Sequence, residues 1–249
     1  MRKIILVFVI ILAVAILYLN RAYARIFSTI GARDLINPTI QQTVSIPSPI
    51  TTSTAQITYV ALGDSLTAGV GATYQEDSYP YRVAKLLVQE NSALVTIVNL
   101  GKPGAVSADV LNQQLPQALS LHPDVVTLAI GINDMLNRVP ASVFGKNIST
   151  IADDLAGAVK HVNIINIPYL GGGKTFWPPY RYYFDRQTRK YNGYLVEALA
   201  GKNVFIIDLY TQTHERALND SSYYSADGFH PSEKGYEFWS NIIYGNLNY

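Results

Sequence analysis

Five apolar runs rich in Val and Ile recur along the chain, and each is followed by a stretch long enough to form a helix. Continuous rather than alternating apolar runs are typical of strands buried on both faces, and connections longer than a hairpin turn favour parallel pairing. The pattern therefore predicts an α/β fold, a three-layer α/β/α sandwich around a five-stranded parallel sheet. The predicted strands are 57–62, 94–100, 125–130, 162–167 and 204–209.

Amphipathic patterns between these runs predict the covering helices. The clearest lies over 143–159, where Phe144, Ile148 and Leu155 share one face while Asp153 and Asp154 fall on others. In an open parallel sheet, ligands bind beyond the carboxyl ends of the strands, so the functional residues are expected there. The other predicted helices are 81–90, 108–119, 186–200 and 232–244.

The chain begins with Arg2 and Lys3, followed by sixteen uninterrupted apolar residues over 4–19. A helix of that length reaches roughly 24 Å, short of the roughly 30 Å hydrocarbon core of a bilayer. Ala22-Tyr23-Ala24 suits signal peptidase, but the run exceeds the usual core of a signal peptide. Residues 1–24 are therefore predicted to be either a signal peptide or a membrane anchor, and both place the remaining chain outside the cytoplasm, secreted or membrane-anchored.

Residues 25–56 are predicted to be a juxtamembrane segment and linker. From 36 to 56 the chain carries no charge and is rich in Pro, Thr and Ser, which favours an extended tether. An irregular strap lying on the domain is the alternative. Residues 57–249 form one domain's worth of chain. They carry 14 Lys and Arg against 17 Asp and Glu, a net charge of −3, so no nucleic-acid partner is expected.

Ser65 follows the first predicted strand in the sequence Gly-Asp-Ser-Leu-Thr-Ala-Gly, which differs from the Gly-x-Ser-x-Gly elbow of α/β-hydrolases. A serine at a strand end is a candidate nucleophile if a base and oxyanion donors lie nearby. A serine that only caps the next helix is the alternative.

A carboxylate precedes a histidine by three residues in Asp227-Gly228-Phe229-His230-Pro231. A turn can bring the two side chains together, so that Asp227 fixes the imidazole tautomer and His230 takes the serine proton. A capping aspartate and a surface histidine remain the alternative. Because a neutral imidazole must act as the base, activity is expected to fall below roughly pH 6 to 7.

Two further strand ends offer donors for an oxyanion. Asn133 follows the third predicted strand, and Gly101 follows the second within Asn99-Leu100-Gly101-Lys102-Pro103-Gly104. An amide side chain and a backbone N–H can both stabilise a developing negative charge. Asn and Gly also occupy ordinary turns, which is the alternative for both positions.

These four segments resemble the four blocks of the GDSL esterases, the SGNH hydrolase family, and occur in the same order over nearly all of 57–249. The resemblance implies a flavodoxin-like SGNH hydrolase fold and a serine esterase acting on lipid or acetylated-glycan esters without a cofactor. It assigns Ser65 as nucleophile, His230 as base and Asp227 as the orienting acid. The Ser65 and Gly101 amides and the Asn133 side chain would form the oxyanion hole.

Several alternatives stay open beside this interpretation. A cell-envelope O-acyltransferase and a non-catalytic binding module share the fold. The absence of cysteine and the scattered histidines disfavour a metal site, and no complete nucleotide-binding motif is present.

Asp64 and Asp134 are predicted to be structural. The aromatic segment 169–184 follows the fourth predicted strand and is expected to form a wall of the substrate site, chiefly through Phe176 and Trp177, with Tyr74 as a second candidate. The alternative is that this segment packs its rings on its own domain.

Overall fold

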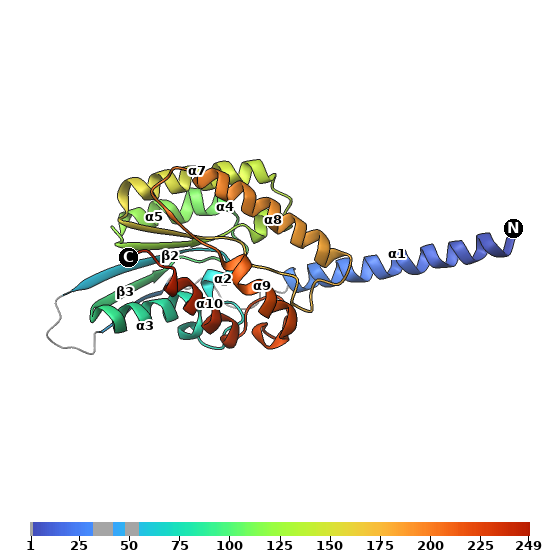
Figure 1. Cartoon of the computed structure of the whole chain (residues 1–249), viewed down its shortest axis with the longest axis horizontal. Coiled ribbons are helices and arrows are strands. Elements are labelled where there is room, and N and C mark those ends of the chain that lie inside the picture. The colour runs from blue at the N-terminus through green and yellow to red at the C-terminus, as the bar shows by residue number, and fades with distance from the viewer. Residues whose placement is uncertain (1, 32–41, 48–54) are drawn as a thin grey trace.

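The computed structural model of the chain describes residues 2–31, 42–47 and 55–249. Its centre is a sheet in the order β1-β3-β2-β4-β5-β6 with helices on both faces, which confirms the predicted sandwich (Figure 1). The last five strands of the chain are parallel, and their order is the flavodoxin-like one. They are β2 (Gln56–Gly63), β3 (Leu94–Asn99), β4 (Val125–Ala129), β5 (His161–Ile165) and β6 (Phe205–Ile207).

A sixth strand, β1 (Gln42–Ile46), pairs antiparallel with β3 and corrects the predicted count of five. It lies within the segment expected to be a tether, so that expectation is wrong for these residues. Val44 and Ile46 are half-buried against the core, whereas Thr43 and Ser45 are exposed. This alternation is typical of an edge strand with one solvated face. The rest of the predicted tether, 36–41 and 48–54, lies outside the described residues.

One face of the sheet is covered by α7 (Ala141–Ala158) and α8 (Tyr180–Leu199), which pack against each other through Phe144 and Tyr191. A helical stretch over 107–120 covers the same face. It consists of α4 (Ser107–Asp109), the π-helical turn η3 (Val110–Gln114) and α5 (Leu115–Ser120). Helix α8 begins six residues before its predicted start, so the end of the aromatic segment is helical.

The other face is covered by α3 (Tyr79–Asn91) and α10 (Glu233–Gly245), whose buried side chains join a second core with β2 and β3. Figure 1 shows these helices below the sheet, with α9 beside them. The remaining elements are short or were not predicted: α2 (Ser65–Ala68), η2 (Gln75–Asp77), α6 (Ile132–Leu136), α9 (Leu209–Asn219) and η4 (Ser221–Tyr223).

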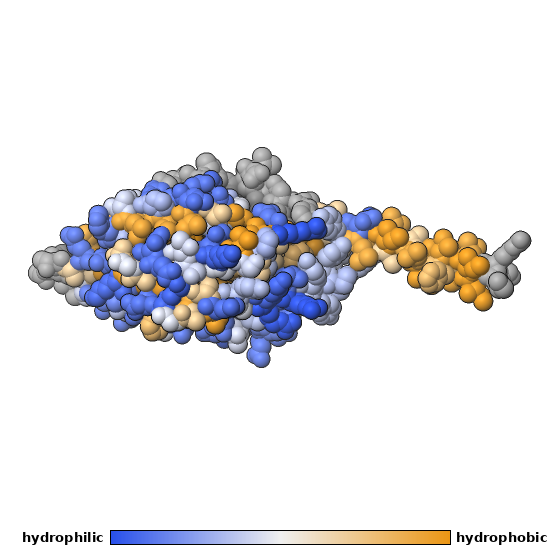
Figure 2. Space-filling model, turned by 90° about the horizontal axis from the view of Figure 1, so that it is seen from above, coloured by the Kyte–Doolittle hydropathy of each residue, from blue (hydrophilic) through white to orange (hydrophobic). Residues whose placement is uncertain are grey.

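Helix α1 (Arg2–Gly31) runs through the predicted boundary at residue 24 without a break. Its stretch Ile4–Ile26 is long and apolar enough to cross a membrane. Its first half projects away from the domain as an apolar rod (Figures 1 and 2). Farther along, Ala22 and Ile26 are fully buried, so this part of α1 packs on the domain.

Candidate active site

Ser65 is the first residue of α2, directly beyond the carboxyl end of β2, and its side chain is 2% exposed. The strand end is held by Gln114, whose side-chain amide accepts from the Gly63 N–H and donates to the Gly63 carbonyl, both at 2.9 Å. Gly63 has φ +153°, and a Cβ there would lie 2.3 Å from the carbonyl oxygen of Ala129. Glycine therefore lets β2 turn sharply against β4 just before the serine.

Three side chains meet in a continuous hydrogen-bonded line. His230 Nε2 lies 3.0 Å from Ser65 Oγ, and His230 Nδ1 lies 2.5 Å from Asp227 Oδ2. The other carboxylate oxygen of Asp227 accepts from the N–H groups of Phe229 and His230, at 2.8 and 2.9 Å, and from Ser225 Oγ at 2.9 Å. The imidazole is fully buried and its orientation is fixed from both sides. This arrangement can take a proton from the serine hydroxyl.

The environment of Asp227 favours its charged form. Burial alone would raise the pKa of this carboxyl, but the hydrogen bond and charge of His230 and the two backbone amides outweigh it and hold the pKa well below its usual range. The group is thus a carboxylate at neutral pH. Beside this carboxylate the neutral imidazole carries its hydrogen on Nδ1 and donates it in a hydrogen bond to Asp227, so that the lone pair of Nε2 faces Ser65.

Asn133 and Gly101 occupy different surroundings. Asn133 lies in α6, and its Nδ2 donates to the Ala105 carbonyl at 2.9 Å. The Gly101 N–H already donates to Asn99 Oδ1 at 2.9 Å, so the geometry does not fit the predicted role of this amide. Gly104 lies next to Ala105, has φ +81°, and has open space where a Cβ would be. Its N–H donates no hydrogen bond within the described part of the chain.

Asp64 and Asp134 have structural contacts, as predicted. Asp64 Oδ1 accepts from the Leu66 N–H at 3.0 Å and so caps α2. Asp134 accepts from both the N–H and the hydroxyl of Ser107, at 2.8 and 2.5 Å. Burial raises the pKa of Asp134, and the hydrogen bonds from Ser107 offset this only in part. The two carboxylates fix the elements that carry Ser65 and Asn133.

The predicted substrate walls do not form one surface. Phe176 is buried, with its ring 4.8 Å from that of Phe184 and 5.8 Å from that of Phe229. Trp177 is 36% exposed and stacks on Tyr18 of α1 with ring centroids 6.2 Å apart. Tyr74 is 67% exposed. Phe176 therefore packs on its own domain, which was the alternative for this segment.

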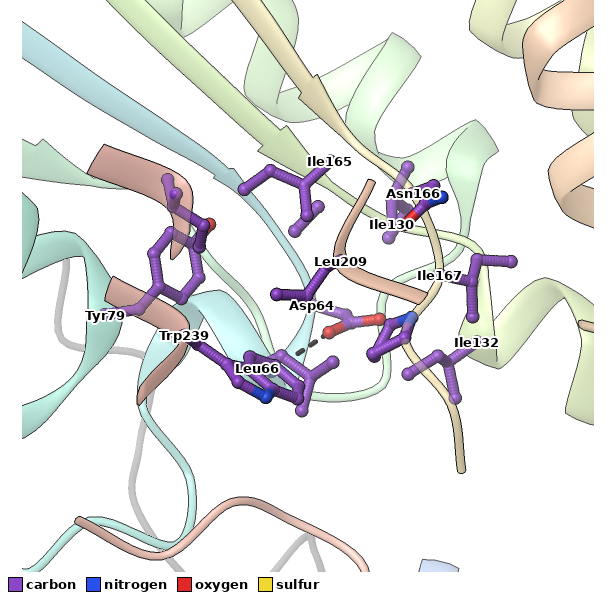
Figure 3. A pocket seen from close by; sticks show the side chains of 13 residues that line it. Asp64, Leu66, Tyr79, Ile130, Ile132, Ile165, Asn166, Ile167, Leu209 and Trp239 are labelled. Atoms are coloured by element: carbon purple, nitrogen blue, oxygen red, sulfur yellow. Dashed lines mark hydrogen bonds between the residues drawn. The ribbon is translucent and has the colours of Figure 1, made fainter. Parts of the chain in front are cut away.

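Behind the serine turn lies a void of only about 10 Å³ with mostly apolar walls (Figure 3). Figure 3 shows the Asp64 carboxylate at its centre, bonded to Leu66, with Ile130, Ile132 and Ile167 around it. A volume of this size is at the lower limit for one water molecule, so it cannot hold a substrate. Among the described residues no group of three His, Asp or Glu side chains is placed to hold a metal ion.

Sequence comparison finds related hydrolases. The model of the GDSL-like Lipase/Acylhydrolase family matches residues 61–238. The spore germination lipase LipC of Bacillus licheniformis is 25% identical over 209 residues, which cover 76% of this chain and 97% of that protein. An arylesterase of Vibrio mimicus is 37% identical over 97 residues, which cover 36% of this chain and 44% of the arylesterase.

Solved structures share the fold. The acetylxylan esterase Axe2 from Geobacillus stearothermophilus superposes with a TM-score of 0.63 at 18% identity, covering 78% of this chain and 94% of Axe2. The lipase Lip_vut3 from a goat rumen metagenome superposes with a TM-score of 0.63 at 23% identity, covering 76% of this chain and 97% of the lipase. At these identities the similarity concerns the arrangement of strands and helices.

Proposed function

Because the chain belongs to the GDSL-like lipase/acylhydrolase family of ester-hydrolysing enzymes, we propose that Ser65 is the nucleophile that attacks the ester carbonyl. His230 takes the proton from Ser65 Oγ as the new C–O bond forms, and then gives it to the departing alcohol as the ester bond breaks. Asp227 holds the imidazole and stabilises its charged form. Water, activated by the same imidazole, then releases the acid and restores Ser65.

The oxyanion that forms during this attack needs donors on the opposite side of the carbonyl from the base. We assign them to the Ser65 N–H at the start of α2, the side-chain amide of Asn133, and the Gly104 N–H in place of Gly101. The hydrogen bond from Asn133 to the Ala105 carbonyl supports this assignment because it ties the residue directly after Gly104 to the asparagine. Each such donor contributes on the order of a hundred- to a thousandfold in rate.

One observation carries the proposal: the unbroken line of hydrogen bonds from Ser65 Oγ through both nitrogens of His230 to Asp227. A capping serine does not need a histidine at 3.0 Å, and a surface histidine would not be fully buried. A histidine that acts as general base needs one ring nitrogen facing the nucleophile and the other held by an acid that orients the ring. His230 has its nitrogens in these two positions.

The substrate is a carboxylic ester of lipid or acetylated-glycan type, in keeping with the lipase and arylesterase relatives and the acetylxylan esterase neighbour. We place the domain, residues 57–249, outside the cytoplasm with α1 retained as its membrane anchor. The packing of Ala22 and Ile26 on the domain supports retention of the helix. Cleavage after Ala24 would remove Ala22 and so disrupt this packing.

Replacement of the nucleophile tests the proposal. We expect Ser65→Ala to lower kcat for p-nitrophenyl acetate by at least about a thousandfold and to abolish labelling by a fluorophosphonate. Ser120→Ala, which changes an exposed serine at the end of α5, should leave both unchanged. Full labelling of Ser65→Ala, or a rate within tenfold of wild type, would overturn the assignment. Release of the free acid in water distinguishes hydrolysis from transfer to a sugar hydroxyl.

A further inference from the structure

The last part of the apolar stretch in α1 is tied to the aromatic segment after β5. Tyr18 stacks on Trp177 with an interplanar angle of 24°, and the Arg25 guanidinium lies 4.9 Å from the centre of the Trp177 ring. On the same stretch of α1, Ala22 and Ile26 face the domain and are fully buried. Residues 18–26 of α1 therefore belong to the surface of the domain.

The free part of α1 is too short to span a membrane by itself. Residues 4–17 project from the domain and cover about 21 Å as a helix, against a hydrocarbon core of roughly 30 Å. The full apolar stretch Ile4–Ile26 covers roughly 34 Å and is sufficient. For α1 to span the bilayer, residues 18–26, which pack on the domain, must therefore lie in the bilayer as well. The part of the domain around Trp177 must then lie at the depth of the lipid headgroups.

The side chains at that surface suit a membrane interface. Trp177, Tyr182 and Tyr183 are all at least 36% exposed, and the Arg181 guanidinium lies 5.5 Å from the centre of the Tyr182 ring. Exposed Trp and Tyr gather at the level of the headgroups, where their rings contact both lipid and water. Neighbouring arginines, including Arg25, are attracted to anionic lipid.

A pocket of about 470 Å³ opens at the same place, between α1, α6 and α8. This volume is within the range of ligand sites, and its walls are mainly apolar and aromatic. Arg138 lines it, is exposed, and forms no ion pair within the described residues. The walls include Tyr23 from α1, Met135 and Leu136 from α6, and Tyr183 and Phe184 from α8.

The pocket adjoins the candidate active site in two ways. Met135 and Leu136 lie on the same short helix as Asn133, one of the proposed oxyanion donors. From Phe184, ring contacts pass through Phe176 to Phe229, whose ring packs edge-on against His230 at 4.9 Å. The pocket wall at Phe184 is thus linked to the general base through the rings of Phe176 and Phe229.

We propose that this pocket receives the acyl chain of an ester lipid drawn from the membrane that α1 spans, while the ester group reacts at Ser65. The inference rests on the proposed function and narrows its substrate from esters in general to membrane lipids. An acyl chain that leaves the bilayer at headgroup depth enters an apolar pocket without crossing water. The exposed guanidinium of Arg138 at the pocket complements the phosphate of a lipid headgroup.

Filling the pocket tests the inference in the full chain, reconstituted in vesicles of phosphatidylcholine and phosphatidylglycerol. The measured quantity is the ratio of kcat/KM for p-nitrophenyl palmitate to that for p-nitrophenyl acetate. We expect Leu136→Trp to lower this ratio at least about tenfold, because the larger ring would displace part of the acyl chain from the pocket. A loss of this size corresponds to the contacts of one or two methylene groups. The control Val196→Trp enlarges an exposed side chain on α8 three turns beyond Phe184 and should leave the ratio unchanged.

An unchanged ratio in folded Leu136→Trp would overturn the inference. Should that variant fail to fold, Tyr183→Glu places a carboxylate at an exposed position of the pocket wall. This variant too should lower the ratio at least about tenfold, and an unchanged ratio would overturn the inference. A wild type that cleaves the acetate but not the palmitate would overturn the lipid assignment and leave the proposed function standing. Hydrolysis of the acetate that survives Ser65→Ala would overturn the proposed function, and this inference with it.

Discussion

Asp227 is the residue on which the orientation of the base depends. One of its oxygens lies in hydrogen-bond contact with His230 Nδ1, while the other accepts hydrogen bonds from two backbone amides and from Ser225. We expect Asp227→Asn to lower kcat for p-nitrophenyl acetate by roughly a thousand- to ten-thousandfold with little change in KM, because an amide donor facing Nδ1 would favour the wrong tautomer.

Asp220→Asn is the matched control for this change. Asp220 is a carboxylate in the same C-terminal region, but it pairs with Lys234 and not with the histidine. Its replacement should leave kcat within about twofold, as usual for an exposed ion pair. Equal losses in the two variants would mean that Asp227 acts through the stability of the region and not through the imidazole.

The lowered pKa of Asp227 also predicts how stability depends on pH. A carboxyl that is a stronger acid in the folded chain stabilises it fully above its unfolded pKa of about 3.9, and this contribution is lost as pH falls through the lower folded value. We therefore expect the urea midpoint of wild type to fall more steeply below roughly pH 4 than that of Asp227→Asn. Parallel curves for the two proteins would contradict the shift.

Contacts between residues that are close in the sequence could be predicted more directly than contacts between residues that are far apart in it. Asp227 and His230 are three residues apart, so a single turn determines their contact. The contact between Ser65 and His230 could be expected only because the ends of parallel strands meet at one edge. Which glycine after β3 is free to donate could not be predicted, since it depends on Asn99 folding back onto the Gly101 amide.

At the scale of elements, the five parallel strands could be predicted because each is a continuous apolar run. β1 could not, because only Val44 and Ile46 are half-buried among its residues 43–46, and its uncharged neighbours resemble a linker. The short helices α2 and α6 also escaped prediction, since a helix of one turn has no apolar periodicity to detect. These short helices carry Ser65 and Asn133.

The alternation along β1 gives a test of its place in the sheet. We expect Val44→Asp to lower the free energy of unfolding by about 1 to 3 kcal/mol, because it brings a charge against the core beside β3. Thr43→Asp, one residue earlier on the exposed face, should change it by no more than about 0.5 kcal/mol. Urea unfolding of the full chain measures both, and equal effects would show that β1 does not pair as described.

At the scale of the whole molecule, the proposed retention of α1 would keep the enzyme at the membrane. We expect the mature protein to sediment with membranes, to resist extraction by alkaline carbonate, and to begin upstream of Arg25 when its N-terminus is sequenced. Leu12→Arg, which places a charge in the middle of the projecting part of α1, should release a large fraction, because it opposes insertion by about 3 kcal/mol. A soluble wild-type species beginning at Arg25 would contradict retention.

The hydrogen bond between Ser65 and His230 joins residues 165 positions apart, and the intervening chain contains β3, β4, β5 and β6. A ribosome therefore makes Ser65, the proposed nucleophile, early and His230, the proposed base, only after the whole parallel sheet has been synthesised. Until then Ser65 is an ordinary alcohol of low reactivity. In the proposed mechanism, a nascent chain consequently cannot attack esters around it, and hydrolysis begins only when translation has supplied the turn that carries His230.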